Sequence, residues 1–183
     1  MELAQSHRFS RQEYYQMLEV GILTEDSRVE LIEGEILALA AQNRRHAYAT
    51  TKLNRLLMNG YGDGYHVRVQ LPIQIDDYSE PEPDFAVVSD AQLEASGEHP
   101  CEAILLVEVA DTSLAFDRIK KARLYGRAGF PEYWVANLRE GTLIVHTQPT
   151  ESGYQKVETF CASDPNCPVA LGSVLAPQAA ANC

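Results

Sequence analysis

The sequence predicts a single α/β domain in which a β-sheet is flanked by helices. Its length of 183 residues, with no internal repeat and no dividing linker, fits one domain with a sizeable core. Along the chain, segments with helical periodicity alternate with strand-like segments, a pattern typical of helices packed on a sheet. Residues 1–160 carry this pattern. Residues 161–183 form a poorly patterned tail, whose alanine-rich end we expect to fray.

The composition is that of an ordinary globular protein, with 45% hydrophobic and 22% charged residues. No apolar run is long enough to cross a bilayer, and the polar start, Met1 to Phe9, lacks the apolar core of a signal peptide. We therefore expect no membrane association and a cytoplasmic location. The cysteines form no C-x-x-C pair, which favours free thiols over a zinc site or a disulfide framework. They are Cys101, Cys161, Cys167 and Cys183.

The net charge of −11 argues against tight, non-specific binding to nucleic acid, because phosphate contacts need Lys and Arg side chains. Basic residues gather in only two places. Each group could form a local basic patch that binds nucleic acid, or could simply be a solvated helix face. The groups are Arg44 with Arg45, and Arg118, Lys120, Lys121, Arg123 and Arg127.

The first half of the chain contains two predicted helices and three predicted strands before the acidic loop. Ser10 and Glu13 have capping-box spacing, which predicts a helix to about Glu19. Two strands follow within Arg28–Leu39 around a tight turn, and then a helix over Arg44–Met58. Strict alternation over His66–Ile75 predicts a half-buried strand, which we expect to pair with the short apolar strand after Asp84.

The second half is organised around one uniformly apolar run, Ala103–Val109, which predicts a central strand of the sheet. Leu114–Ala128 has a helical pattern and is ended by Gly129 and Pro131. Three further strands are predicted after it. They are Tyr133–Asn137, Leu143–Thr147 and Tyr154–Phe160.

A carboxylate lies inside the central strand, where its burial is costly unless it is paired or binds a metal. This residue is Glu108, and Asp84 opens the neighbouring apolar run. If the two meet at adjacent strand ends, carboxylates about 4 Å apart repel by about 4 kcal/mol at an effective dielectric constant near 20. A hard divalent ion such as Mg²⁺ or Mn²⁺ would relieve that repulsion. Lys121, on the following helix, could then neutralise a phosphoryl group or hold the attacking water, which suits phosphodiester hydrolysis.

Each of these residues also has a structural interpretation. Asp84 could end a turn after two prolines, and Lys121 could pair with Asp117 at i, i+4 for a few tenths of a kcal/mol. Glu30, between Val29 and Leu31, could be an exposed edge residue. His46 lies on the apolar face of its predicted helix and could be a packed or capping residue.

Taken together and in order, six sequence motifs resemble the PD-(D/E)XK nuclease superfamily, and within it the Uma-two family of restriction-endonuclease-like proteins. The resemblance covers roughly Phe9 to Phe160. Its motifs are V-E-L-I-E-G-E-I at Val29–Ile36, His46, P-E-P-D-F-A-V-V at Pro81–Val88, L-L-V-E-V-A at Leu105–Ala110, D-R-I-K-K at Asp117–Lys121 and Y-G-R-A-G-F-P-E-Y-W-V at Tyr125–Val135.

The resemblance implies a restriction-endonuclease-like mixed sheet flanked by helices and a Mg²⁺-dependent nuclease site, with Mn²⁺ as a substitute. Carried over by position, Asp84 and Glu108 are metal ligands, Glu30 is a third acidic residue and His46 is a pocket residue. The superfamily's lysine normally lies two residues after the second acid, where this chain has alanine. The resemblance therefore points to Lys121 on the next helix.

Lys120 is the alternative lysine, but it would face about 100° away from Lys121 on a helix. The expected partner is nucleic acid, with DNA the expected kind. Many nucleases of this fold are dimers, so the resemblance also suggests a homodimer. No DNA-reading module such as a helix-turn-helix or zinc finger is evident in the sequence.

Three functional hypotheses follow. The first is a Mg²⁺-dependent endonuclease that uses Asp84, Glu108 and Lys121. The second is a catalytically inactive protein on a nuclease fold that acts as a binding or regulatory subunit, which the net charge and the missing strand lysine favour. The third is a metal-dependent hydrolase of a smaller phosphoester.

Overall fold

The computed structural model describes residues 6–95, 99–161 and 163–168. The predicted alanine-rich end of the tail, with Cys183, lies outside these residues. Cys101, Cys161 and Cys167 are free thiols, as predicted. No helix in the described part of the chain is long and apolar enough to span a membrane.

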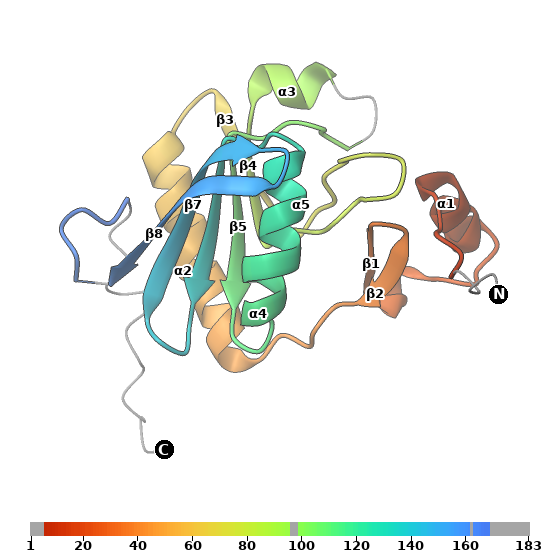
Figure 1. The fold of residues 1–183 in the computed structure, drawn as a ribbon, viewed down its shortest axis with the longest axis horizontal. Helices are drawn as coiled ribbons and strands as arrows, with labels where there is room; N and C mark the ends of the chain where they lie inside the picture. Colours follow the sequence, from red (N-terminus) through yellow and green to blue (C-terminus); the bar gives the residue numbers. More distant parts are fainter. Residues whose placement is uncertain (1–5, 96–98, 162, 169–183) are drawn as a thin grey trace.

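Six strands form the main sheet, and they are ordered in space as they are in the chain (Figure 1). All neighbours pair antiparallel except β5 and β6, which are parallel, so the sheet is mixed. The parallel pair requires a crossover, and a helical segment supplies it. The strands are β3 (Tyr65–Val69), β4 (Phe85–Ser89), β5 (Leu105–Ala110), β6 (Glu132–Asn137), β7 (Thr142–Thr150) and β8 (Gly153–Cys161).

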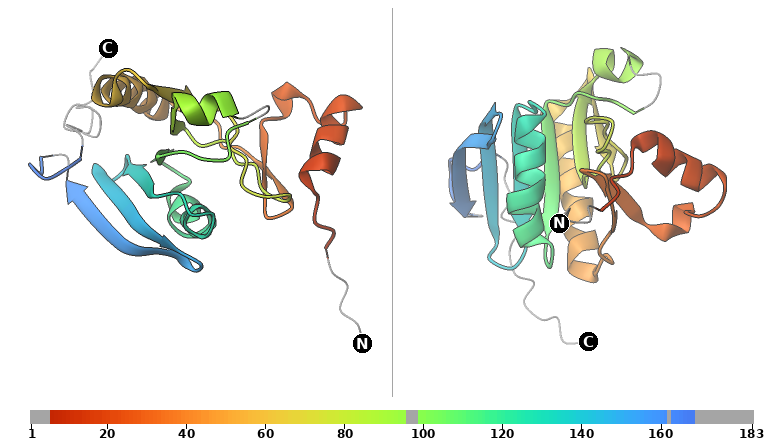
Figure 2. Two further views of the ribbon diagram at one scale, coloured as in Figure 1. Left: turned by 90° about the horizontal axis from the view of Figure 1, so that it is seen from above. Right: turned by 45° about the vertical axis from the view of Figure 1, so that its right-hand side comes forward.

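Helices cover both faces of this sheet, as the view from above shows (Figure 2). On one face, α2 (Arg44–Tyr61) packs Ala49, Leu53 and Leu57 against alternate residues of the central strands. The other face is covered by the crossover, in which α4 (Leu114–Phe116), a π-helical turn η2 (Asp117–Lys121) and α5 (Ala122–Arg127) follow without interruption. The single α/β domain with a mixed sheet and flanking helices is thus confirmed.

Strand β5 is central, with β4 on one side and β6 on the other, and all six of its residues are buried. This is the physical basis of its uniformly apolar sequence. Glu108 lies on the same face of β5 as Leu106 and Ala110, and therefore faces the crossover helix. The polar residue singled out in the sequence is consequently enclosed by protein on the side where α5 packs.

A smaller unit lies beside the main sheet (Figures 1 and 2). It consists of α1 (Arg11–Glu19) and the hairpin of β1 (Val29–Ile32) and β2 (Glu35–Ala38), with a short 3₁₀ turn η1 (Glu25–Ser27) between them. Ser10 caps α1 in the predicted capping box.

The hairpin turns at Glu33 and Gly34 as predicted, and both residues have positive φ. A bridge from Leu31 to Glu80 ties the hairpin to the loop before β4.

The long strand predicted over His66–Ile75 is wrong in its second half. Strand β3 ends at Val69, and the pairing with β4 is as expected. Gln70 adopts a left-handed conformation with φ 51°, which breaks the strand, and Pro72 has no N–H to donate to a ladder. The apolar alternation of the sequence continues beyond Val69, but the side chains there do not share one buried face. Ile73 is buried, whereas Leu71 is exposed.

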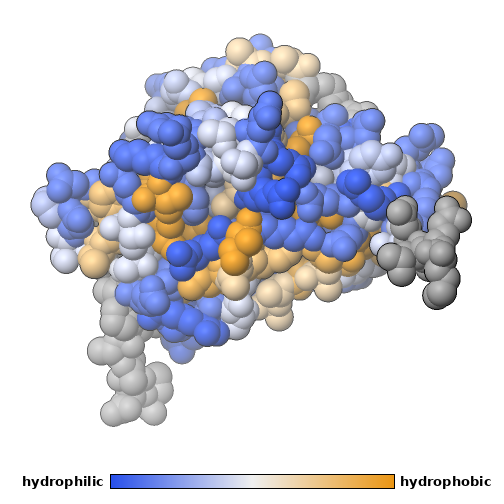
Figure 3. Space-filling model, in the orientation of Figure 1, coloured by the Kyte–Doolittle hydropathy of each residue, from blue (hydrophilic) through white to orange (hydrophobic). Residues whose placement is uncertain are grey.

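The short helix α3 (Asp90–Ala95) follows β4. Seen from one side, the molecule has a largely hydrophilic surface with apolar residues in smaller groups between the polar ones (Figure 3).

Candidate functional site

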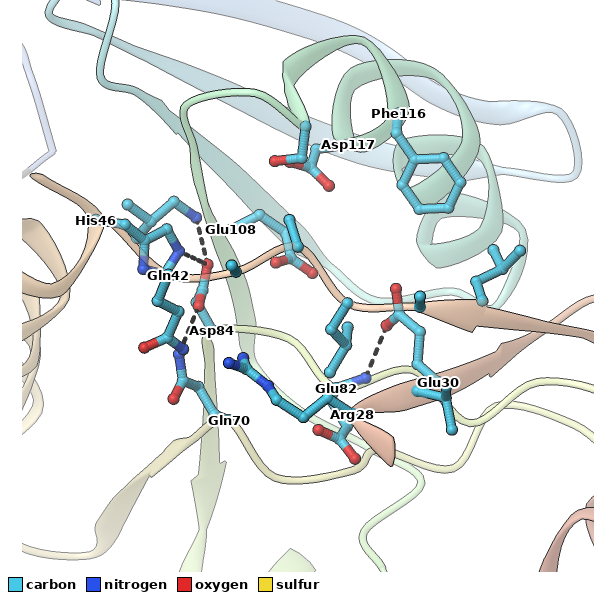
Figure 4. Close-up of a pocket in the computed structure, with 18 of the residues that line it drawn as sticks. Arg28, Glu30, Gln42, His46, Gln70, Glu82, Asp84, Glu108, Phe116 and Asp117 are labelled. Atoms are coloured by element: carbon cyan, nitrogen blue, oxygen red, sulfur yellow. Dashed lines mark hydrogen bonds and ion pairs between the residues drawn. The ribbon is translucent and has the colours of Figure 1, made fainter. Parts of the chain in front are cut away.

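The residues singled out in the sequence line one pocket of about 870 Å³ between the hairpin and the edge of the main sheet (Figure 4). Strands β4 and β5 are antiparallel, so the start of β4 and the end of β5 meet at the same edge. Asp84, just before β4, and Glu108, near the end of β5, are therefore brought to the same place. The crossover turn η2 and the β1–β2 hairpin complete the walls.

Asp84 is held by three hydrogen bonds and is 8% exposed. Its Oδ2 accepts from the backbone N–H of Val109 at 2.8 Å and contacts His46 Nε2 at 3.1 Å, while its Oδ1 accepts from Gln70 Nε2 at 3.0 Å. Burial alone would raise the pKa of Asp84, but these contacts outweigh it and lower the pKa. Asp84 is therefore an ionised carboxylate at neutral pH.

Glu108 is held by two donors from the crossover helix. Lys121 Nζ lies 2.9 Å from Oε1 of Glu108, and the hydroxyl of Tyr125 donates to the same oxygen at 3.1 Å. Oε2 of Glu108 accepts no hydrogen bond from the described residues, and the side chain lines the pocket. One oxygen of this carboxylate is thus fixed by the protein, and the other is available to a ligand.

Glu30 is buried, so the edge interpretation of this residue is wrong. Its Oε2 lies 3.1 Å from Lys121 Nζ and accepts from the backbone N–H of Glu82 at 3.1 Å. The hairpin therefore brings a second carboxylate to the lysine of the crossover helix.

The two candidate lysines point in different directions. Lys121 is 4% exposed and lies between Glu108 and Glu30, whereas Lys120 reaches outward to Glu35 at 2.5 Å. Burial acts to lower the pKa of Lys121, but the surrounding carboxylates outweigh it and raise the pKa well above its ordinary value. Lys121 is therefore a permanent cation, which can stabilise negative charge but cannot accept a proton.

His46 occupies the first turn of α2, which Asn43 caps by accepting a hydrogen bond from the His46 N–H. Its Nε2 contacts Asp84 at 3.1 Å and its Nδ1 lies 3.3 Å from the hydroxyl of Thr50. Burial lowers the pKa of His46, but the hydrogen bond to Asp84 and that residue's charge more than offset this and raise it. His46 therefore lines the pocket, with one ring nitrogen at the Asp84 carboxylate and the other at the Thr50 hydroxyl.

Four further pocket residues were not singled out as site residues in the sequence. Asp117 begins the π-helical turn and is 3% exposed, and burial raises its pKa to about 6. Glu82, whose pKa is raised by burial and by nearby Glu30, faces the same space. Gln70 holds Asp84, and Arg28 enters from the base of β1.

Two of them had a sequence signal, since Asp117 lies four residues before Lys121 on the predicted helix and Glu82 lies within the motif at Pro81–Val88. Ion-pair contacts of Lys121 go to Glu108 and Glu30, however, so the local i, i+4 pair does not account for it.

The oxygen donors of this pocket suit a hard divalent cation. Burial raises the pKa of Glu108 well above its usual value, and the charges of Asp117, Asp84 and Glu30 act in the same direction, with Lys121 opposing them. A divalent cation would relieve this concentration of negative charge. Within residues 6–95, 99–161 and 163–168, no three His, Cys, Asp or Glu side chains already form a metal-binding group. Mg²⁺, however, typically uses one or two carboxylates, with water and substrate phosphates as its other ligands.

The fold of this chain is similar to that of a solved structure. A solved structure titled a putative nuclease belonging to DUF820, from Anabaena variabilis, superimposes with a TM-score of 0.63 over 83% of this chain and 84% of that chain. The two sequences are 16% identical, so the likeness is one of fold. None of the curated proteins matches this chain.

The family is shown by the sequence profile of Uma2, described as "Putative restriction endonuclease", which matches residues 11–175. The chain belongs to the Uma2 family, which confirms the resemblance seen in its motifs.

Proposed function

We propose that this protein is a Mg²⁺-dependent nuclease that hydrolyses phosphodiester bonds, with DNA as its nucleic acid. The observation that carries the proposal is the meeting of Asp84 and Glu108 at adjacent strand ends, with Lys121 Nζ 2.9 Å from Glu108. Two carboxylates and a buried cation in one pocket are the parts that this reaction needs.

Asp84 and Glu108 would hold the metal, with Mn²⁺ as a substitute for Mg²⁺. When bound, the metal would polarise a phosphoryl oxygen and lower the pKa of a coordinated water. In the hydrolysis, a water oxygen bonds to phosphorus, one phosphorus–oxygen ester bond breaks, and the departing oxygen takes up a proton.

Lys121 carries a fixed positive charge beside Glu108, so its role is to stabilise the negative charge that develops on the phosphoryl oxygens, or to orient water. It is a permanent cation and is not the base. His46 contacts Asp84 at 3.1 Å and orients that carboxylate. Glu30 is an additional acidic residue of the metal site or a partner of Lys121, at 3.1 Å from its Nζ.

Metal binding tests the proposal without any assumption about substrate. Calorimetric titration with Mn²⁺ should show binding to the wild-type protein and loss of binding in Asp84→Asn, which preserves the shape of the side chain. Asp63→Asn is the matched control, because Asp63 is an exposed loop residue outside the pocket. A hundredfold excess of Mn²⁺ over its dissociation constant should also stabilise the wild-type fold by about 2.7 kcal/mol.

Cleavage is the second arm of the test. Wild-type protein should cleave nucleic acid in Mg²⁺, and both EDTA and the Asp84→Asn or Glu108→Gln substitution should abolish cleavage while the circular dichroism spectrum is unchanged. Wild-type protein that binds no Mn²⁺ and cleaves nothing would instead favour a binding or regulatory protein on this fold. The net charge of −11 and the ion pairs that already engage Lys121 favour that second candidate.

Cleavage of a small phosphodiester but not of a polynucleotide would favour a hydrolase of smaller esters. The predicted homodimer remains a prediction, which sedimentation of the purified protein would test.

A further inference from the structure

The carboxylates of the proposed metal site lie below the molecular surface. Glu30, Glu108 and Lys121 are 4 to 5% exposed, and Asp84 is 8% exposed. A DNA duplex carries its phosphates on the outside of a rod that stays stiff over roughly 150 base pairs. Such a rod contacts groups at a surface, whereas a flexible single strand or a chain end can enter a recess.

Two walls from different parts of the chain confine the space above these residues. One wall is formed by the β1–β2 hairpin and residues 39–43, and the other by η2 and the end of β5. The pocket is open on one side, and its volume of about 870 Å³ is in the range of pockets that take up discrete small ligands. This size suits a short segment of nucleic acid.

The charges that line the pocket also favour a short segment of nucleic acid over a duplex. Of its cationic side chains, Lys121 is paired with Glu108 and Glu30, and His46 is in contact with Asp84. The guanidinium of Arg28 makes neither a hydrogen bond nor an ion pair with the described residues. Proteins that bind duplex DNA typically neutralise about six to ten phosphates. A single available guanidinium in an acidic pocket is suited to one phosphate.

Arg28 is held in a conformation that non-glycine residues adopt rarely. Its φ of 47° and ψ of 65° are left-handed, and its carbonyl accepts a hydrogen bond of 2.8 Å from the N–H of Leu39. Figure 4 shows the side chain extending into the pocket on the side of Gln70 and Asp84. Backbone strain of this kind is concentrated at functional sites, where surrounding structure maintains it.

An aromatic ring lies in the same space, with the ammonium of Lys120 5.9 Å from the ring centroid on one side. Phe116 lines the pocket from the crossover helix and is partly exposed (Figure 4). Stacking of unpaired bases on aromatic side chains is a common mode of single-strand recognition and tolerates any base.

From these observations we propose that the pocket takes a single-stranded segment or a chain end of nucleic acid, with one phosphate at Arg28, and not a continuous duplex. The proposal rests on the proposed function, since it names the substrate class of the same site. Arg28 is a substrate-binding residue in this account, and Asp84 and Glu108 remain the metal-binding groups.

Measurements of equilibrium binding test this proposal independently of the proposed nuclease activity. A labelled 12-nucleotide strand and the blunt-ended duplex of the same sequence are titrated by fluorescence anisotropy, with Ca²⁺ in place of Mg²⁺ and at several NaCl concentrations. We expect the single strand to bind at least tenfold more tightly than the duplex. We also expect a shallow dependence of log K on log[salt], because few phosphates are contacted.

Arg28→Gln should weaken single-strand binding and reduce the magnitude of the salt slope by about 0.7, the value for one phosphate on a single strand. Arg28→Lys should retain most of the slope. Arg55→Gln is the matched control, because Arg55 is an exposed arginine of α2 outside the pocket, and it should change neither quantity.

Equal or tighter binding of the duplex would overturn the proposal, as would identical behaviour of Arg28→Gln and Arg55→Gln, or no binding of either nucleic acid. Single-strand binding that depends on Arg28, without hydrolysis in Mg²⁺, would support this proposal while contradicting the proposed nuclease activity.

Discussion

The ammonium of Lys121 lies 2.9 Å from Oε1 of Glu108, and both residues are at most 5% exposed. The pair joins the crossover helix to the central strand, and Glu30 adds a second carboxylate at 3.1 Å from the same nitrogen. A buried charge that loses its partner is left without compensation, which is far more costly than losing a surface ion pair.

Replacement of Lys121 should therefore destabilise the fold strongly. We expect Lys121→Met to lower the free energy of unfolding at pH 7 by about 3 to 5 kcal/mol, because Glu108 and Glu30 remain buried without their cation. Urea denaturation followed by circular dichroism measures this. Lys120→Met is the control, since Lys120 pairs with the exposed Glu35 and should contribute at most about 1 kcal/mol. Similar losses in the two variants would contradict the account of a buried, site-forming pair.

Asp117 should make stability depend on pH in a direction opposite to that of most carboxylates. Burial raises its pKa from 3.8 to about 6, so the folded state binds the proton more tightly than the unfolded state. The stability that the protonated Asp117 side chain contributes is fully present below the pKa of this group in the unfolded chain. It is lost as the pH rises from about 4 to about 6. A pKa difference of this size corresponds to roughly 2 to 3 kcal/mol.

Asp117→Asn removes this titration and should therefore be more stable than wild type at pH 7.5, by up to the same roughly 2 to 3 kcal/mol. The advantage should disappear near pH 4, where Asp117 is protonated in both states. Unfolding measured at the two pH values checks this, with Asp63→Asn at an exposed loop position as the control variant. A constant difference between the two pH values would show that the effect has another origin.

Two glycines in helices should respond in opposite ways to alanine. A Cβ at Gly126 in α5 would lie 2.3 Å from the carbonyl carbon of Gly153, which is backbone and cannot move aside without shifting β8. We expect Gly126→Ala to lower the free energy of unfolding by more than about 2 kcal/mol. Gly60 in α2 has nothing within 4 Å of such an atom, so Gly60→Ala should stabilise the protein by about 0.4 to 1 kcal/mol. Thermal unfolding of both variants tests the close approach of α5 to β8, and a harmless Gly126→Ala would contradict it.

The sequence identified the central strand and its buried acid because Glu108 interrupts an otherwise apolar run. The same local reasoning could not place Glu30, whose burial depends on a hairpin packing across the loop before β4. The π-helical turn at Asp117–Lys121 was likewise not predicted from the sequence.

The extent of β3 was overestimated for a related reason. Alternation continues past Val69, and only the left-handed conformation of Gln70 reveals the break. Arg28 carried no signal, because a single arginine beside a strand is ordinary in sequence. Its role in the pocket comes from the backbone conformation of that residue and from the position of the hairpin.

Two buried tyrosines offer a way to determine the charge state of Glu108. The hydroxyl of Tyr125 donates to Oε1 of Glu108 at 3.1 Å, and that of Tyr133 donates to the backbone carbonyl of Asp117 at 3.1 Å, with both rings fully buried. A hydrogen bond to an ionised group contributes about 1.5 to 3 kcal/mol, and one to a neutral group about 0.5 to 1.5 kcal/mol. Tyr125→Phe should therefore lower the free energy of unfolding at pH 7 by more than Tyr133→Phe does.

Burial raises the pKa of Glu108, while the ammonium of Lys121 favours the ionised form that a metal ion would need. A larger loss for Tyr125→Phe, measured by urea denaturation, means that Lys121 prevails and Glu108 is a carboxylate at pH 7. Equal losses in the two variants would mean that Glu108 is protonated without metal, in which case metal binding must release a proton. Titration with Mn²⁺ in buffers of different ionisation enthalpy would then detect that proton directly.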